Sequence, residues 1–476
     1  MRSTQVSQRS NSPRRAKDPV RFLVIVGIVG AVVLGAGYVA TNAVANSVVP
    51  KESKTLPSAP VTKVLNVRRA PTTLSTVTRT GQLQRALQGF SNQIPNGSCA
   101  SVQWMDQQQL SVDVTRQVVP ASAQKIVTAI AALEVLTPAF TFDTSVFAVG
   151  DPASGTVQDL YFVGGGDPVL VRKEYITTEK YPTINGTSLE TLADSIVASG
   201  VRSVTGSIVG IDARYDAVRF LDIWPAEFRV VESGPLGALV VNDGAVVGAA
   251  MKPDNPAIAA STELRSVLGA RGVLVGQDAR YELSVPANAT KIATISSAPL
   301  SAIVQEMLVN SDNNTAELLL KEIGFARKKL GTTAAGISVI QELMASWKLP
   351  TEGTVVDGSG LSSLNKMSCA NFLALLAKAE ETLPSLLPIA GKTGTLRSVF
   401  NDSVMEGRLV GKTGTLTGVK ALTGYLPLEG NSPVRFALVM NASGIDNQGS
   451  YRPIWLSFGA ALNKARAVPT PEQLMP

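Results

Sequence analysis

The clearest feature of the hydropathy pattern is an uncharged apolar run near the N-terminus. Residues 22–40 read FLVIVGIVGAVVLGAGYVA and contain no charged side chain. As a helix rising 1.5 Å per residue, this run is about 28 Å long, close to the thickness of a bilayer core. The run therefore predicts a membrane segment. Its length favours a retained anchor over a cleaved signal peptide, although Ala43-Val44-Ala45 would suit a signal peptidase.

The positive charge of the chain is concentrated around this run. Residues 1–21 carry a net charge of +5, residues 22–85 carry +6, and residues 86–476 carry −5. Because basic flanks stay in the cytoplasm, residues 1–21 are expected to form a cytoplasmic tail and the remainder to lie outside. Cleavage near Ala45 would instead release the protein. The basic residues are not interleaved with aromatic ones, so no nucleic-acid partner is expected.

Residues 41–85 are rich in Ser, Thr and Val and show no helical period. They also contain Pro50, Pro57, Pro60 and Pro71. This composition predicts an extended linker between the membrane segment and the body of the protein.

The pattern beyond the linker mixes helices and strands. A strand-like stretch near residues 100–114 precedes a helix beginning at Ser122, where apolar residues recur at i, i+3 and i+4. Further helices are expected near residues 188–199, 298–309, 314–325, 332–347, 369–380 and 450–465. Residues 409–416, 419–428 and 433–441 read as three successive antiparallel strands. We expect an α+β domain formed by residues 86–150 and 290–476, interrupted by an insertion at 151–289.

The composition excludes several kinds of catalytic and metal site. The chain of 476 residues contains no histidine, which excludes Ser-His-Asp and Cys-His catalysis as well as His-ligated metals. Its two cysteines, Cys99 and Cys369, are too few for a zinc site or a disulfide scaffold. A single bridge between them and two buried thiols both remain open, because the sequence does not give their separation.

Ser122 and Lys125 offer a nucleophile and a base without histidine. Their spacing places the hydroxyl and the amine on one face of a helix. Lys125 would have to be neutral to accept the serine proton, so its pKa must fall well below about 10.4 through burial and a nearby positive charge. The backbone N–H groups of the helix N-terminus suit an oxyanion. Ser363 and Lys366 repeat the spacing, so this motif alone is weak.

Two later motifs sharpen the prediction. Ser311-Asp312-Asn313 and Lys412-Thr413-Gly414 follow in the order found in β-lactamases and penicillin-binding proteins. Each has a competitor, since residues 363–365 also read S-x-N and residues 392–394 also read Lys-Thr-Gly. Motif order favours Ser122 over Ser363. We favour Lys412 over Lys392 because Lys412 lies on a strand that pairs forward into two more, whereas Lys392 follows a proline-broken helix.

The chain resembles peptidase family S13, the class C low-molecular-mass penicillin-binding proteins that act as D-alanyl-D-alanine carboxypeptidases and endopeptidases. The matching stretches are PASAQK (120–125), VGGGDPVL (163–170), SDNNTAELLLKEIG (311–324), DGSGLSSLN (357–365), GTLRSVF (394–400) and GRLVGKTGTLTGVKALTGY (407–425). GKTG at 391–394 departs from the family pattern. The resemblance implies a penicillin-binding/β-lactamase-like fold, with an antiparallel sheet flanked by helices.

The resemblance also implies a mechanism. Ser122 would attack the bond between two D-alanines of a peptidoglycan stem peptide with Lys125 as general base, and Ser311 and Asn313 would assist. The terminal carboxylate of the peptide would bind Lys412 and Thr413, on the strand that continues through Gly414. The N–H groups of Ser122 and Thr415 would form the oxyanion hole. No metal or cofactor is expected, and β-lactams should bind.

The sequence leaves several alternatives open. Asp312 is expected to be a structural loop residue, and VGGGDP and residues 357–360 to be turns. A serine β-lactamase or a non-catalytic penicillin-binding sensor would share the three motifs. On the family resemblance, the enzyme is expected at the extracytoplasmic face of a bacterial cell membrane. The sequence leaves open the balance of carboxypeptidase and endopeptidase cleavage, the role of the insertion and the oligomeric state.

Overall fold

The computed structural model describes residues 19–46, 70–179, 182–229, 231–429 and 431–466, which belong to two compact units. In the first unit, Met1–Asn66, the described element is helix α1 (Pro19–Asn46), which contains the expected membrane segment at 22–40. Among the described residues, no helix combines the length and hydropathy needed to cross a bilayer. Most of the expected basic tail and the linker at 47–69 lie outside the described residues.

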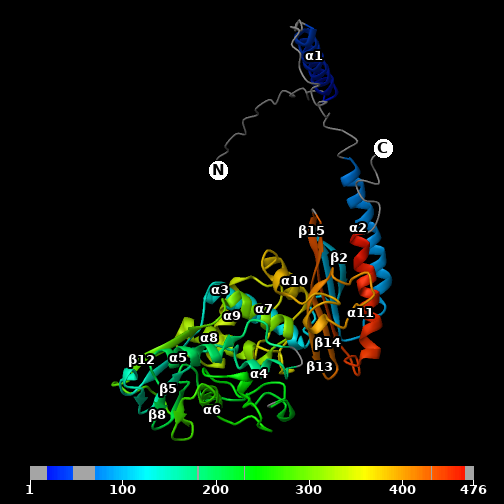
Figure 1. The fold of residues 1–476 in the computed structure, drawn as a ribbon. Coiled ribbons are helices and arrows are strands. Elements are labelled where there is room, and N and C mark those ends of the chain that lie inside the picture. Colours follow the sequence, from blue (N-terminus) through cyan, green and yellow to red (C-terminus); the bar gives the residue numbers. More distant parts are fainter. Residues whose placement is uncertain (1–18, 47–69, 180–181, 230, 430, 467–476) are drawn as a thin grey trace, which may run out of the picture. The chain divides into compact units, whose positions relative to one another are not determined.

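A five-stranded antiparallel sheet organises the second unit, Val67–Pro476 (Figure 1). Its order is β13-β14-β15-β1-β2. The strands are β1 (Cys99–Trp104), β2 (Gln107–Val112), β13 (Val410–Leu416), β14 (Val419–Leu428) and β15 (Asn431–Asn441). The first hairpin thus joins the sheet by pairing β1 with β15, so the two ends of this unit share one sheet. The three expected C-terminal strands are confirmed.

Five helices lie on one side of this sheet (Figure 1). They are α3 (Lys125–Leu136), α7 (Leu300–Asn310), α8 (Asn313–Lys328), α9 (Thr333–Ser346) and α10 (Cys369–Lys378). Their apolar faces form one core with the sheet, in which Ile126, Phe372 and Val439 are fully buried. Tyr425 Oη of β14 donates to the carbonyl oxygen of Leu376 in α10 at 2.8 Å. The α+β architecture expected from the sequence is confirmed.

The opposite side of the sheet is covered by α2 (Ala70–Ser91) and α11 (Gln448–Leu462), which run side by side in Figure 1. Helix α2 corrects the prediction of an extended linker through residue 85. Leu83, Leu87 and Phe90 are buried at helical spacing, and the Phe90 and Phe458 ring centroids lie 5.0 Å apart. The surrounding Thr, Val and Gly residues hid this short apolar stripe in the sequence.

The segment between α3 and α7 forms a separate sheet with its own core. Its order is β11-β9-β5-β3-β12. The strands are β3 (Asp143–Ala148), β5 (Leu160–Val163), β9 (Ile208–Ile211), β11 (Arg280–Tyr281) and β12 (Thr290–Ser296). The predicted insertion at 151–289 lies inside this segment. Its sheet also takes in β3 and β12, which the prediction assigned to the peptidase domain, because these two strands pair with each other.

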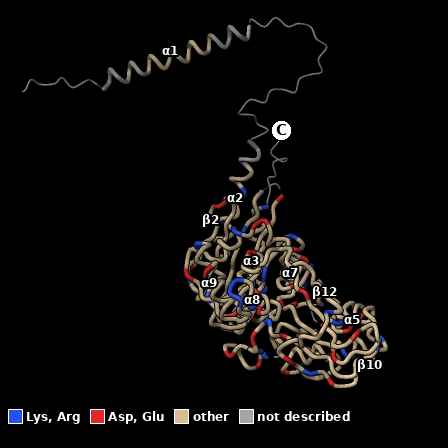
Figure 2. The backbone as a smooth tube through the Cα atoms, turned by 90° about the vertical axis from the view of Figure 1, so that its left-hand side faces the viewer, with Lys and Arg blue, Asp and Glu red and all other residues tan. Residues whose placement is uncertain are grey.

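Smaller elements complete this inserted segment. A three-stranded parallel sheet contains β4 (Thr156–Val157), β8 (Ser203–Val204) and β10 (Leu274–Val275), and β6 (Leu170–Val171) pairs with β7 (Thr187–Ser188). The helices are α4 (Lys173–Ile176), α5 (Leu189–Ala198) and α6 (Pro256–Gly269). Figure 2 shows Lys and Arg interspersed with Asp and Glu over the second unit, consistent with the small net charge of residues 86–476.

The inserted segment is attached to the helical layer by polar contacts. Trp224 Nε1 donates to Asp357 Oδ2 at 3.0 Å, and Ser233 Oγ donates to Asn314 Oδ1 at 2.7 Å. The first contact joins the insertion to the loop between α9 and α10, and the second brings it to the start of α8, where the Ser-Asp-Asn motif lies.

A disulfide joins Cys99 in β1 to Cys369 at the start of α10, with the Cα atoms 5.9 Å apart. The sequence left this pairing open because 270 residues separate the two cysteines.

Candidate active site

Ser122 and Lys125 lie on the turn that leads into α3. Residues Ala121–Gln124 form a 3₁₀ turn, η1, and α3 begins at Lys125 rather than at the serine. Ala121 has a φ of 48°, in the left-handed region that non-glycine residues rarely adopt. Lys125 Nζ lies 3.1 Å from Ser122 Oγ, within hydrogen-bond distance. The nucleophile and base proposed from the sequence therefore meet.

Lys125 is fully buried, and three oxygen atoms surround its amine. Besides Ser122 Oγ, Nζ contacts Asn313 Oδ1 and the carbonyl oxygen of Ser359, each at 2.7 Å. Burial lowers the pKa of Lys125 to about 8, against the opposing effect of nearby carboxylates led by Asp312. Desolvation, the first cause expected from the sequence, therefore dominates.

The Ser-Asp-Asn motif forms the junction between α7 and α8. Ser311 has a φ of 61° and ends α7, and Asp312 caps α8 by accepting from the Thr315 N–H at 2.6 Å. Asn313, the first residue of α8, directs its Oδ1 to Lys125. Its Nδ2 donates to the carbonyl oxygen of Glu232 at 2.6 Å, which fixes the orientation of the amide.

Strand β13 contributes the third motif. Lys412 is fully buried, and its Nζ donates to Ser311 Oγ and to the carbonyl oxygen of Thr413, both at 2.8 Å. Burial lowers the pKa of Lys412 well below its usual value, and the charges of Lys125 and Lys420 lower it further. Two buried lysines thus lie at one site, and Ser311 contacts the second of them.

The backbone of β13 lies directly against the serine turn. A Cβ atom on Gly414 would lie 2.6 Å from the carbonyl oxygen of Pro120, a distance that atoms do not tolerate. Only glycine permits this approach. On either side of it, Thr413 Oγ1 donates to Thr395 Oγ1 at 2.8 Å, and Thr415 Oγ1 accepts from Lys420 Nζ at 2.8 Å. Thr413, Gly414 and Thr415 therefore lie beside Ser122, on the edge strand of the sheet.

The side chains of the competing motifs have other partners. The Lys392 side chain is 55% exposed and forms an ion pair with Glu406 at 2.5 Å. Ser363 is exposed on the loop after Asp357, and Asn365 donates to Asp357 Oδ1 at 2.8 Å. The geometry thus brings Lys412, and not Lys392, to Ser311.

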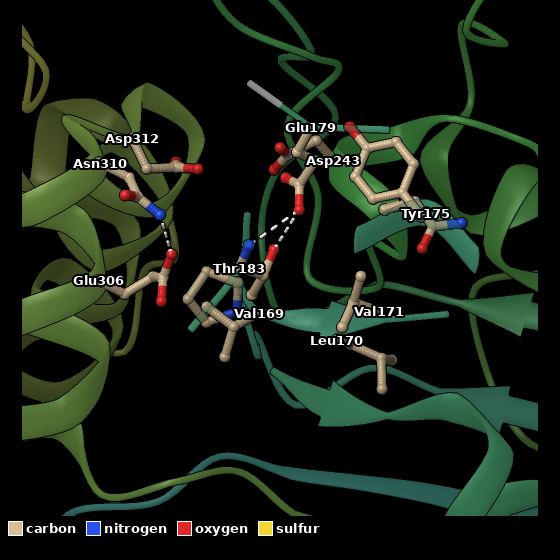
Figure 3. Close-up of a pocket in the computed structure, with 12 residues that line it drawn as sticks. Val169, Leu170, Val171, Tyr175, Glu179, Thr183, Asp243, Glu306, Asn310 and Asp312 are labelled. Atoms are coloured by element: carbon tan, nitrogen blue, oxygen red, sulfur yellow. Dashed lines mark hydrogen bonds between the residues drawn. The ribbon is translucent and has the colours of Figure 1, made fainter. Parts of the chain in front are cut away.

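Asp312 lines a small cavity of about 20 Å³, enough for about one water molecule. Figure 3 shows Asp312, Glu306 and Asn310 on one side of this cavity and Glu179 and Asp243 of the insertion on the other. Burial raises the pKa of Asp312 to about 7, and the neighbouring Asp243 adds to the effect. Asp312 is both a helix cap and a member of this acidic cluster.

Sequence reasoning missed several contributors to the site. The Ser359 carbonyl contacts Lys125, Thr395 contacts Thr413, and Lys420 contacts Thr415. Thr395 and Lys420 lay within stretches that resemble the family, but nothing in the sequence gave them a contact. A backbone carbonyl carries no residue-type signal. Within the described ranges, no group of three or more acidic or cysteine side chains could hold a metal ion.

Comparisons with known proteins agree with this geometry. The chain matches the D-Ala-D-Ala carboxypeptidase 3 (S13) family over residues 82–255 and 245–453. It is 30% identical to a D-alanyl-D-alanine carboxypeptidase of Actinomadura sp. over 403 residues, covering 67% of this chain and 72% of that protein. A carboxypeptidase of Mycobacterium tuberculosis is 30% identical over 343 residues, covering 68% of this chain and 72% of the relative.

Solved structures show the same fold. Penicillin-binding protein 4 of Haemophilus influenzae aligns with a TM-score of 0.64 and 18% identity, covering 79% of this chain and 99% of that one. Its complex with a β-lactam aligns with a TM-score of 0.58 and 20% identity over the same shares of both chains. The chain therefore belongs to the D-Ala-D-Ala carboxypeptidase 3 (S13) family of peptidases.

Proposed function

We propose that the protein is a serine D-Ala-D-Ala carboxypeptidase that trims peptidoglycan stem peptides through an acyl-enzyme on Ser122. The observation that carries this proposal is the contact between Ser122 Oγ and the fully buried amine of Lys125 at 3.1 Å. With a pKa of about 8, roughly a tenth of Lys125 is neutral at pH 7, about 300 times the fraction at the usual value of 10.5. A neutral amine at this distance can take the serine proton.

Acylation would proceed by attack of Ser122 Oγ on the carbonyl carbon between the two D-alanines. As the new C–O bond forms, the serine proton passes to Lys125, and the carbonyl oxygen becomes an oxyanion between the N–H groups of Ser122 and Thr415. The close approach of Gly414 to Pro120 supports this arrangement, because it holds β13 beside the serine turn.

Ser311 would relay a proton to the leaving D-alanine amine when the C–N bond breaks. Its hydroxyl would give its proton to the nitrogen and take a replacement from the protonated Lys125, which returns to the neutral form. The Ser311 hydroxyl accepts from Lys412 at 2.8 Å, so Lys412 polarises it toward donation. Asn313 would hold Lys125 through Oδ1. Water would then hydrolyse the ester of Ser122, with Lys125 again as the base.

Lys412 and Thr413 would bind the terminal carboxylate of the peptide. The Lys412 amine contacts two neutral oxygens, Ser311 Oγ and the Thr413 carbonyl, so its charge can meet a substrate anion. The burial that lowers its pKa would be offset by an incoming carboxylate, which favours the protonated lysine. As the edge strand, β13 can also pair with the extended peptide backbone.

Incubation with labelled penicillin followed by a chase tests this function against two alternatives. Rapid loss of label would identify a serine β-lactamase. Stable label without release of D-alanine from a D-Ala-D-Ala peptide would identify a non-catalytic sensor. We expect stable label, D-alanine release, and loss of both in Ser122→Ala. Cleavage of cross-linked peptides in the same assay measures the endopeptidase share.

We also propose that the enzyme works at the extracytoplasmic face of a bacterial membrane, anchored by residues 22–40 with the N-terminus inside. The uncharged run, its basic flank and the disulfide between Cys99 and Cys369 support this location, since disulfides persist in oxidising compartments. Membrane fractionation and N-terminal sequencing of the mature protein test the proposal. Recovery in the soluble fraction with a new N-terminus near residue 45 would replace the anchor by a cleaved signal.

A further inference from the structure

The carbonyl oxygen of Ser359 contacts Lys125 from a loop that lies outside the three motifs. Two backbone N–H groups of this loop point at one carboxylate oxygen. Glu317 Oε1, on α8, accepts from the Gly358 N–H at 3.0 Å and from the Ser359 N–H at 2.8 Å. From α3, Thr128 Oγ1 donates to the Gly358 carbonyl oxygen at 2.7 Å. The peptide that contacts the base is thus held from both helices that carry the active-site side chains.

The rest of this loop is equally constrained. Asp357 is fully buried and accepts from Gly360 N–H, Ser362 N–H and Asn365 Nδ2, each at 2.8 Å. Gly360 has a φ of +82°, and a Cβ atom there would lie 2.0 Å from the carbonyl oxygen of Ala121. The loop therefore packs directly against the residue that precedes the nucleophile.

The number of hydrogen atoms on the Lys125 amine determines which way its lone pair points. A neutral primary amine has two N–H bonds and one lone pair. Asn313 Oδ1 and the Ser359 carbonyl oxygen can only accept, so they take both N–H bonds. The lone pair is then left facing Ser122 Oγ, the third neighbour of Nζ. Without the Ser359 carbonyl, the amine could rotate and turn an N–H toward the serine.

We infer that Glu317 is a positioning residue of the acylation step: by holding the 358–359 peptide, it keeps the Ser359 carbonyl on Lys125 and directs the lysine lone pair at Ser122. This inference rests on the proposed role of Lys125 as the base. Glu317 itself touches neither substrate nor reacting atoms.

The charge of Glu317 gives the inference a measurable signature. Glu317 is fully buried and its Oε2 has no hydrogen-bond partner among the described residues. Burial, and then Asp357, raises the pKa of Glu317 to about 7. When ionised, Glu317 raises the pKa of Lys125, as do Asp312, Asp357 and Glu232, while Lys412 is the facing cation. Removing the Glu317 charge alone should therefore lower the pKa of Lys125.

Two substitutions separate the acceptor from the charge. Glu317→Gln keeps an oxygen for both N–H groups but removes the charge, whereas Glu317→Leu removes both. Glu322→Gln is a matched control, because Glu322 is also a fully buried carboxylate of α8 but pairs with Arg214 at 2.6 Å instead of the loop. Thermal unfolding and circular dichroism establish that each variant is folded.

The first readout is the rate of Ser122 acylation by labelled penicillin between pH 5.5 and 10. We expect Glu317→Leu to lower the maximal acylation rate about 100-fold with little change in the half-saturating concentration, the usual cost of misplacing a catalytic group. Glu317→Gln should stay within about tenfold of the wild-type maximum, and the midpoint of its acid limb should move to lower pH. Glu322→Gln should change neither the maximal acylation rate nor the midpoint of the acid limb. A wild-type rate in Glu317→Leu, or an unmoved limb in Glu317→Gln, would overturn the inference.

The second readout does not depend on activity. NMR titration of protein labelled with [ε-¹³C]lysine follows the Lys125 resonance, identified by its loss in Lys125→Arg. Its midpoint should fall in Glu317→Gln and stay unchanged in Glu322→Gln. An unchanged midpoint in Glu317→Gln contradicts the inference, even where Glu317→Leu fails to fold. Wild-type protein that resists acylation would instead refute the proposed function, and the titration would still decide the place of Glu317.

Discussion

Lys412 and Lys392 form a matched pair that tests how the site recognises its substrate. Both begin a Lys-Thr-Gly sequence, but only Lys412 is fully buried beside Ser311, whereas Lys392 is 55% exposed beside Glu406. The perturbation is the same substitution at each position, Lys412→Gln and Lys392→Gln. Glutamine keeps much of the side-chain volume and a donor but removes the charge.

The size of the effect follows from the contact that is lost. A hydrogen bond to a charged group contributes about 1.5–3 kcal/mol, which corresponds to a fall of about 10- to 150-fold in kcat/KM. We therefore expect a loss in this range for Lys412→Gln. Lys392→Gln should leave kcat/KM unchanged, because the Lys392 side chain is more than half exposed and pairs with Glu406 rather than with Ser311.

The assay measures D-alanine release from a tripeptide ending in D-Ala-D-Ala, and release of D-alaninamide from the same peptide with its terminal carboxylate amidated. Wild-type enzyme should prefer the free carboxylate by about the factor that Lys412→Gln loses. Lys412→Gln should hardly discriminate between the two peptides. Equal losses from both lysine variants, or full discrimination by Lys412→Gln, would refute the assignment of the carboxylate to β13.

Three further predictions concern stability and packing. Because the folded state raises the pKa of Asp312 from 3.8 to about 7, its ionisation costs stability as pH rises through this interval, so Asp312→Asn should gain up to about 4 kcal/mol at pH 8 and little at pH 4 in urea unfolding. An equal gain at both pH values would contradict this. Reducing the disulfide between Cys99 and Cys369 should cost about 2–5 kcal/mol, and an unchanged unfolding midpoint in reductant would count against it. Gly414→Ala should slow acylation about 100-fold because its Cβ would press on Pro120, and a wild-type rate would disprove this close packing.

The parts of the fold that the sequence predicted have strong local signals. The three C-terminal strands and the helix expected from Ser122, which begins at Lys125, carry clear apolar patterns. They contribute Lys125 and Lys412 to the site. Helix α2 was missed because its buried apolar residues, Leu83, Leu87 and Phe90, lie within a segment of β-branched and small residues. Weak local preference was overridden there by packing against the sheet.

The same contrast holds for the site. Ser122, Lys125 and Asn313 were predictable because the chemistry requires their side chains in a fixed order. The Ser359 carbonyl was not, since any residue type carries one, and its position depends on contacts far along the chain, above all that with Glu317. The pairing of Cys99 with Cys369 likewise depends on the completed fold.

The central claim is that a buried, neutral Lys125 deprotonates Ser122. Its most direct test is the pH dependence of acylation by labelled penicillin, with the adduct located by peptide mass spectrometry. We predict an adduct on Ser122 and an acylation rate that rises with pH, with a midpoint near pH 8, the pKa of Lys125. Lys125→Met should abolish the reaction. An adduct on another residue, or a rate in Lys125→Met equal to that of the wild type, would contradict the claim.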